Sequence, residues 1–406
     1  MKILITDLAY FHHNYGAQAL LLPLIEKIRN RIDAEISITI SDTKYIREDK
    51  IFAKKNNLKL FIKPRLKSST LFSLNDWIQL KKYNNLIKQN DVIIDLAGIE
   101  FIGNLPKTTK WKELLNVIFT QKLAEKYDKI YLKYTKSYGP FIGKFYRRII
   151  KSHFNKLPFL MVRGEENLKN LEQMNLKTLL YSFPDISIGL NAESKTWAKK
   201  YLEKMLLKGK IVGISPSVVI RNIKQNSRQN CSGKNHKILS KMIIKQLIDK
   251  GNSVLIIPHS IGDGKDLTNC DLAFAKEIYA EIENDKLFIL NDTSLAYKEV
   301  RAIIGQLDFY ITGRYHSLVS ALTIKIPVIA LSWHTKYNDI MSLFHKKYLA
   351  INCRKKSIDD AFAEIDEFYQ NRNWFDENYS VKMHKKLIAE IDKSIHLLFT
   401  EIEKKR

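Results

Sequence analysis

The sequence has few cysteines, and none of them is paired at short spacing. Its three cysteines, Cys231, Cys270 and Cys353, lie far apart and form no CxxC motif. This spacing excludes a disulfide framework and a thiolate zinc site, and it is typical of a reducing compartment. No uninterrupted run of about 18 apolar residues indicates a transmembrane helix. In the first 16 residues, polar side chains stand where a signal peptide would need its cleavage region. We therefore expect a cytoplasmic protein.

Motifs typical of metal and nucleic-acid sites are also missing. The neighbouring His12 and His13 are not one helical turn apart, and no cluster of His, Asp and Glu has the spacing of metal ligands. The sequence has no zinc-finger spacing and no ribonucleoprotein aromatic motif. We expect no metal, no cofactor and no nucleic-acid partner.

Acidic residues are scarce relative to basic ones. The chain has 67 Lys and Arg against 43 Asp and Glu, a formal net charge of +24. Such an excess would favour a polyanionic partner or an acidic membrane surface. The lysines are scattered along the chain, however, and compositional bias would supply the same excess. We interpret the charge as a diffuse surface property combined with a local anion site, and it leaves open a peripheral contact with the inner face of the membrane.

Short apolar runs are abundant in the sequence, and segments of helical periodicity separate them. Runs of this length, each followed by a polar or glycine-containing turn and a helix, predict parallel strands covered on both faces. The fold class is therefore α/β, with two doubly wound, Rossmann-like domains facing a cleft. The predicted strands are 2–8, 35–42, 91–98, 129–135, 159–164, 210–217, 253–260, 287–292, 309–314 and 327–333.

The domain boundary is predicted between residues 186 and 209. We expect an N-terminal domain over 1–190 and a C-terminal, donor-binding domain over 209–370. The segment 194–210 predicts a helix with Trp197, Tyr201 and Leu202 at core spacing, ended by Gly209. A last amphipathic helix within 375–406 is expected to pack back on the first domain. The basic stretch 218–235 is predicted to be a mobile loop.

Candidate binding residues follow the predicted strands, where ligands bind in open α/β sheets. Taken singly, each has an ordinary structural explanation, since an arginine can pair with a carboxylate and a histidine can cap a helix. Their convergence on strand ends in both domains favours a cleft. The candidates are Asn14 and Gly16 after the first strand, Arg163 after the fifth, Ser217 and His259 at the start of the second domain, and Arg314, His316 and Lys336 near its end.

Several motifs occur in an order that resembles the polysaccharide pyruvyl transferase family. They are NYGAQALL, DLAG, SYGPF, VRGEEN, FPD, VGISPS, IIPHS, LND and, most specific, GRYHSLVSAL followed by IPVIALSWHTKY. The resemblance extends from about residue 3 to about residue 350. The sequence departs from the family pattern where many members have Gly-Asp instead of Gly16-Ala17 and Gly-Gly instead of Ala97-Gly98, and both departures concern the acceptor side.

The resemblance implies a fold similar to GT-B glycosyltransferases and the transfer of pyruvate from phosphoenolpyruvate to a pair of sugar hydroxyls as a ketal, in cell-surface polysaccharide biosynthesis. The acceptor sugar would be free or lipid-linked. The family's catalytic Arg-x-His pair falls on Arg314 and His316, and its strand-end arginine falls on Arg163. His259 would contact the donor or order its loop, and Lys336 would pair with phosphate or remain solvated.

Two other functions remain open at this point. A glycosyltransferase of the same architecture would use a nucleotide-sugar donor bound in the second domain. A non-catalytic protein that binds anionic glycans would account for the charge without chemistry.

Overall fold

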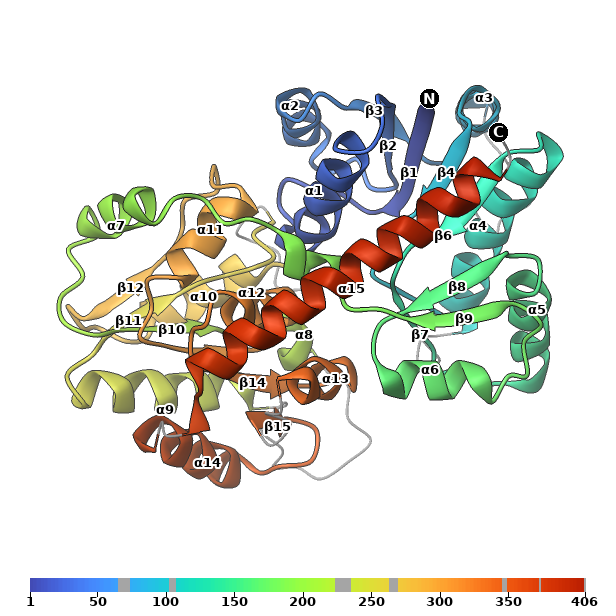
Figure 1. Ribbon diagram of the computed structural model, residues 1–406. Coiled ribbons are helices and arrows are strands. Elements are labelled where there is room, and N and C mark those ends of the chain that lie inside the picture. Colours follow the sequence, from blue (N-terminus) through green and yellow to red (C-terminus); the bar gives the residue numbers. More distant parts are fainter. Residues whose placement is uncertain are drawn as a thin grey trace. The chain divides into compact units, whose positions relative to one another are not determined.

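The computed structural model describes residues 1–64, 74–101, 107–222, 235–262, 269–344, 349–371 and 374–404. The chain divides into two compact units, and each is described by itself (Figure 1). Unit 1 comprises Met1–His12, Leu20–Ile186 and Ile388–Arg406, and unit 2 comprises His13–Ala19 and Ser187–Leu387. Helix α1 (Tyr15–Arg29) and helix α15 (Glu377–Glu403) contribute residues to both units.

Unit 1 is built on a parallel five-stranded sheet in the order β3-β2-β1-β4-β6. Its centre is apolar on both faces, and Ile5 of β1 lies opposite Ile38 of β2 and Ile94 of β4. Two further parallel pairs, β5-β7 and β8-β9, accompany this sheet. The strands are β1 (Lys2–Leu8), β2 (Glu35–Ile40), β3 (Lys59–Ile62), β4 (Val92–Asp95), β5 (Ile99–Glu100), β6 (Ile130–Lys133), β7 (Ser137–Tyr138), β8 (Phe159–Val162) and β9 (Leu179–Ser182). The helices between them are α2 (Ile46–Lys55), α3 (Leu74–Gln89), α4 (Lys107–Lys126), α5 (Lys144–Phe154) and α6 (Glu165–Glu172).

Unit 2 has a parallel six-stranded sheet in the order β12-β11-β10-β13-β14-β15. All residues of β13 and β14 are buried, as expected for strands covered on both faces. The strands are β10 (Ile211–Ser215), β11 (Ser253–Ile256), β12 (Leu287–Ile289), β13 (Phe309–Thr312), β14 (Val328–Ser332) and β15 (Ala350–Asn352). The helices are α7 (Lys195–Glu203), α8 (Val218–Arg221), α9 (His236–Asp249), α10 (Asp271–Ala280), α11 (Tyr297–Ile304), α12 (Tyr315–Thr323), α13 (Lys336–Leu343) and α14 (Ile358–Gln370).

The predicted α/β class with two parallel sheets is confirmed, and each of the ten predicted strands is present. Five strands were not predicted: β3, β5, β7, β9 and β15, each two to four residues long. Strands of two to four residues are too short for a recognisable periodic pattern, and β3, although three of its four residues are apolar, has no fully buried residue. Of the predicted loop 218–235, the first residues form α8, and 223–234 lie outside the described residues.

The helix predicted to end at Gly209 ends earlier, at Glu203. Ser194 caps its start by accepting a hydrogen bond from the Trp197 amide at 3.1 Å. Leu206 then has a φ of 59°, a left-handed conformation that interrupts the helix before the glycine is reached. The last helix, α15, begins at Glu377, close to the predicted start.

Candidate active site

In unit 2, Arg314 follows β13 and is held by a buried carboxylate. Its amide donates to Thr312 Oγ1 at 3.0 Å, and its guanidinium Nη2 donates to Asp271 Oδ1 at 2.6 Å. Asp271 is fully buried and also accepts the amides of Val218 and Ser260, each at 3.0 Å. One carboxylate therefore ties together the loops that follow β10, β11 and β13. The Arg314 side chain is 22% exposed, so it is fixed in direction and still reached by solvent.

His316 lies against the glycine of the NYGAQ motif, which is 300 positions earlier in the sequence. A Cβ placed on Gly16 would lie 2.8 Å from His316 Nδ1, closer than real Cβ contacts allow. Residues 13–19 belong to unit 2, where Asn14 forms an antiparallel bridge with Ser260. Asn14 Oδ1 also accepts the Ala17 amide at 3.2 Å, which caps the start of α1. The two predicted site segments are thus in contact, and the His316 imidazole would have to shift if Gly16 carried a side chain.

His259 is buried in an aromatic cluster beside this loop. Its ring centroid lies 5.9 Å from that of Tyr15 and 5.7 Å from that of Tyr297. Burial lowers the pKa of His259 to about 3, and the positive charges of Arg314 and His316 act in the same direction. The ring is therefore neutral at neutral pH and cannot supply a proton there.

Tyr297, which the sequence did not single out, contacts helix α12, which carries His316. Its hydroxyl donates to the His316 carbonyl at 2.7 Å and lies 2.6 Å from Ser320 Oγ. Its amide donates to Gln18 Oε1 at 2.9 Å. An aromatic residue that begins a helix resembles an ordinary core residue, so only the fold reveals this position.

Ser217 is completely buried where β10 ends. Its amide donates to His236 Nε2 at 3.0 Å. A Cβ on Gly313 would lie 2.9 Å from the Ser217 Cβ, so the loops after β10 and β13 meet without room for a side chain. Ser217 therefore positions the loop that carries Arg314.

Lys336 begins α13 and lies among aromatic rings. Its Nζ is 5.1 Å from the ring centroid of Tyr315, 5.0 Å from that of Trp333 and 5.8 Å from that of Tyr337. Cation–π contacts of this kind fix an ammonium group in place. The Tyr337 hydroxyl donates to the Gly313 carbonyl at 2.8 Å, which joins this group to the loop of Arg314.

Arg163 belongs to unit 1, where it forms a buried junction between three strand ends. It is 5% exposed, and its guanidinium donates to the Asp185 carboxylate and to the Gly98 carbonyl. The DLAG, VRGEEN and FPD segments therefore meet through one side chain. The SYGPF segment is bonded to the VRGEEN segment. Asn167 of VRGEEN accepts a hydrogen bond from the amide of Tyr138 of SYGPF at 3.0 Å, and it donates one to the Tyr138 carbonyl at 3.1 Å.

Unit 1 also contains a buried cluster of four charges that the sequence did not indicate. Lys133 Nζ lies 2.5 Å from Asp95 and 2.9 Å from Glu100, and Lys136 Nζ lies 2.5 Å and 2.8 Å from the same two carboxyls. All four side chains are at most 2% exposed. The lysines hold the pKa of Asp95 well below its usual range against the opposing effect of burial, whereas burial and the Asp95 charge raise the pKa of Glu100 to about 7. Lysines in so basic a chain resemble surface residues, so no sequence signal marked them.

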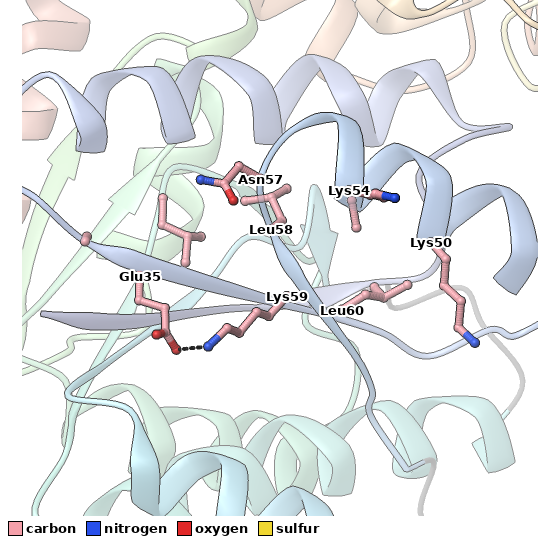
Figure 2. Close-up of a pocket in the computed structure, with 10 residues that line it drawn as sticks. Glu35, Lys50, Lys54, Asn57, Leu58, Lys59 and Leu60 are labelled. Atoms are coloured by element: carbon pink, nitrogen blue, oxygen red, sulfur yellow. Dashed lines mark ion pairs between the residues drawn. The ribbon is translucent and has the colours of Figure 1, made fainter.

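A pocket of about 410 Å³ opens at another place in unit 1, between α2 and the first residues of β2 and β3 (Figure 2). Figure 2 shows Glu35 paired with Lys59, at 2.8 Å, below the residues of α2. The pocket lies at the amino ends of the strands, and ligands bind parallel α/β sheets at the carboxyl ends. Among the described residues, no group of three or more His, Cys, Asp or Glu side chains could hold a metal ion.

The architecture places the protein among GT-B-like proteins, which have two Rossmann-like units. Similar solved structures include HepE (Alr3699) from Anabaena in complex with UDP, at a TM-score of 0.58 with 11% identity and 100% of each chain covered. UGT89C1 from Arabidopsis thaliana matches at a TM-score of 0.57 with 10% identity and 99% of each chain covered. UDP-GlcNAc 2-epimerase from Neisseria meningitidis matches at 0.53, with 11% identity and 100% of each chain covered. At these identities the likeness concerns the fold alone.

The sequence identifies the family. The family model for polysaccharide pyruvyl transferase matches residues 14–335, a range that begins at Asn14 of the NYGAQ segment and includes both Arg314 and His316. The chain therefore belongs to the polysaccharide pyruvyl transferase family, and it is a transferase. No curated protein sequence matches it significantly.

Proposed function

We propose that the protein transfers pyruvate from phosphoenolpyruvate to two hydroxyls of a sugar as a cyclic ketal, in the biosynthesis of a cell-surface polysaccharide. The observation that carries the proposal is the loop of Arg314 and His316, within the family match, with its arginine fixed on Asp271 and its imidazole packed on Gly16. The acceptor would be a sugar, free or lipid-linked. The reaction requires no metal and no cofactor besides the donor.

Arg314 is proposed to bind the donor. Phosphoenolpyruvate carries a phosphate and a carboxylate, which a planar guanidinium binds through parallel hydrogen bonds. Arg314 also stands at the N-terminus of α12, where backbone amides favour negative charge. The bond to the buried Asp271 holds the guanidinium before the donor arrives, which reduces the entropy lost on binding. Lys336 is the second candidate for a phosphate contact.

His316 is proposed to be the general acid. It donates a proton to the methylene carbon of phosphoenolpyruvate, which makes the adjacent carbon cationic and open to attack by a sugar oxygen. Phosphate leaves with its bonding electrons, stabilised by Arg314, and the second hydroxyl closes the ring. One hydroxyl proton restores His316 and the other leaves with phosphate. General acid catalysis of this kind contributes about 10²–10⁴-fold, and the neutral His259 is proposed either to contact the donor by a hydrogen bond or to order its loop.

The test is a direct assay of donor and acceptor. The purified protein is incubated with phosphoenolpyruvate and a panel of nucleotide-activated and lipid-linked sugars, and phosphate release is followed together with the mass of the acceptor. We expect phosphate release that depends on one acceptor and yields the mass of a pyruvate ketal. Phosphate release without that product would contradict the proposal.

A nucleotide-sugar glycosyltransferase is the second candidate, because several similar structures are complexes with UDP. Thermal shift assays separate the two. Stabilisation by phosphoenolpyruvate and not by UDP supports pyruvyl transfer, and the reverse supports glycosyl transfer. A non-catalytic glycan-binding protein would bind acidic glycans equally well after His316→Gln.

A further inference from the structure

Large apolar side chains are exposed at the N-terminal ends of α4 and α5 in unit 1. Phe145 is 66% exposed, Leu115 52% and Ile142 49%. Trp111 of α4 connects the two helices, because its ring centroid lies 5.9 Å from that of Phe145 and 5.7 Å from that of Tyr146. We call the group of Trp111, Leu115, Ile142 and Phe145 the α4–α5 surface.

Basic residues are neighbours of this apolar group in the sequence. The segments 109–118 and 141–148 contain three lysines and two arginines, which are Lys110, Lys112, Lys144, Arg147 and Arg148. Their one acidic residue, Glu113, is turned inward: it accepts the Phe101 amide at 2.9 Å, and burial raises the pKa of its carboxyl. The surface therefore combines exposed apolar side chains with an almost uncompensated positive charge.

We propose that the α4–α5 surface docks the protein on an anionic phospholipid membrane. Interfacial attachment needs apolar side chains that enter the acyl boundary and cations that remain among the headgroups, and both are present within two helical turns. A polyanion such as nucleic acid would bind the cations and leave Phe145 and Ile142 without a role. In the described part of the chain, no helix is long and apolar enough to cross a membrane.

The position of the α4–α5 surface in unit 1 bears on how a lipid-linked sugar would reach the protein. Helices α4 and α5 follow β5 and β7, so they begin at the carboxyl edge of this separate parallel pair, and ligands of parallel sheets bind at such edges. A membrane at the α4–α5 surface would present a lipid-linked sugar to that edge. This consequence rests on the proposed function, whereas the docking itself does not.

Vesicle flotation tests the docking. The full-length protein is mixed with vesicles of phosphatidylcholine alone or of phosphatidylcholine with phosphatidylglycerol. We expect binding only to the phosphatidylglycerol vesicles, weakened by added salt. We expect Ile142→Ser with Phe145→Ser to lower partitioning by about tenfold or more, and Arg147→Glu with Arg148→Glu to lower it by a similar factor.

Two exposed apolar residues elsewhere are the matched control. Trp77 is 62% exposed on α3 and Leu206 is 75% exposed after α7. We expect Trp77→Ser with Leu206→Ser to float like the unmodified protein. Circular dichroism melts of each variant establish that it is folded, and a misfolded serine pair is replaced by Phe145→Gln alone.

Three outcomes would overturn the proposal. The first is that the unmodified protein does not bind anionic vesicles. The second is that the control pair loses binding as Ile142→Ser with Phe145→Ser does. The third is that Ile142→Ser with Phe145→Ser binds vesicles normally. The last result would indicate attraction by charge alone. Assays of the unmodified protein separate the two proposals: vesicle binding without pyruvyl transfer to any acceptor leaves the docking intact and removes the function, and pyruvyl transfer without vesicle binding does the opposite.

Discussion

The two strand-end arginines, Arg163 in unit 1 and Arg314 in unit 2, have different environments although each pairs with a buried aspartate. Arg163 is 5% exposed and is bonded to both Asp185 and a backbone carbonyl. The Arg314 side chain is 22% exposed and stands at the start of a helix beside His316. An arginine enclosed by its partners holds loops together, whereas one that is fixed on one side and exposed on another can bind a ligand. The same residue type at the end of a strand thus has two different environments, and the one around Arg314 leaves more of the side chain open to solvent.

The largest effect is expected in the buried charge cluster of unit 1. Lys133→Met leaves two buried carboxylates with one lysine, and we expect the free energy of unfolding to fall by about 3–5 kcal/mol. Urea denaturation measures the change. The double variant Lys133→Met with Glu100→Gln restores neutrality and should recover part of the loss. A single variant as stable as the unmodified protein would show that the cluster is not needed for folding.

Next in size is the loss of the proposed proton donor. His316→Gln should lower turnover with phosphoenolpyruvate by at least about a hundredfold, with donor affinity within a few-fold, because only the proton transfer is removed. Steady-state kinetics and a thermal melt measure both. His259→Gln is the comparison, and its main effect is expected on stability. Full activity of His316→Gln would remove His316 from the mechanism.

Acid should destabilise unit 2 through its buried histidines. Burial lowers the pKa of His236 and of His259 to about 3 from an ordinary value of 6.5. Between these values the unfolded chain binds protons that the folded chain does not, so stability falls as pH falls from about 6.5 towards 3. Each fully protonating histidine contributes a slope of about 1.4 kcal/mol per pH unit. Urea denaturation between pH 7 and pH 5 measures the slope, and a stability that is flat over this range would contradict it.

Replacing each of the two arginines by lysine compares their roles directly. Arg314→Lys keeps the charge and loses the planar fork, so kcat/KM for phosphoenolpyruvate should fall by about tenfold, roughly 1.4 kcal/mol. Because Asp271 is buried, some stability should be lost as well. Arg163→Lys should lower stability more than Arg314→Lys does. Steady-state kinetics and thermal melts of both variants distinguish a binding role from a structural one. Wild-type kinetics in Arg314→Lys would show that Arg314 has a structural role and does not bind the donor.

The smallest change concerns the contact between Gly16 and His316. Gly16→Ala adds one methyl group where the imidazole lies, so the ring must shift. We expect a loss of turnover of a few-fold to about tenfold, because misplacement of a catalytic group lowers the rate. Ala17→Gly, at the next position, is the matched control and should retain activity. Equal activity of Gly16→Ala and the unmodified protein would show that the site tolerates the shift.

The sequence alone determined the α/β class, ten strands and the motifs at their carboxyl ends. Apolar runs followed by polar turns are local patterns, and parallel strands place their ends at one edge of a sheet, so Arg314 and His316 could be placed at a strand end from the pattern of residues around them. The family match agrees with the assigned family, and the similar solved structures agree with the assigned fold. The role of the individual residues in catalysis stays a prediction.

Only the tertiary structure decided which of these residues are partners. Asp271 lies 43 positions from Arg314, and Gly16 lies 300 positions from His316, so no local pattern connects them. The burial of Lys133, Lys136 and Arg163 likewise depends on carboxyl groups from other segments of the chain, without which a lysine or an arginine would remain in water. Local periodicity specifies strands and their order along the chain, but the environment of a charge is set by the groups that folding brings around it.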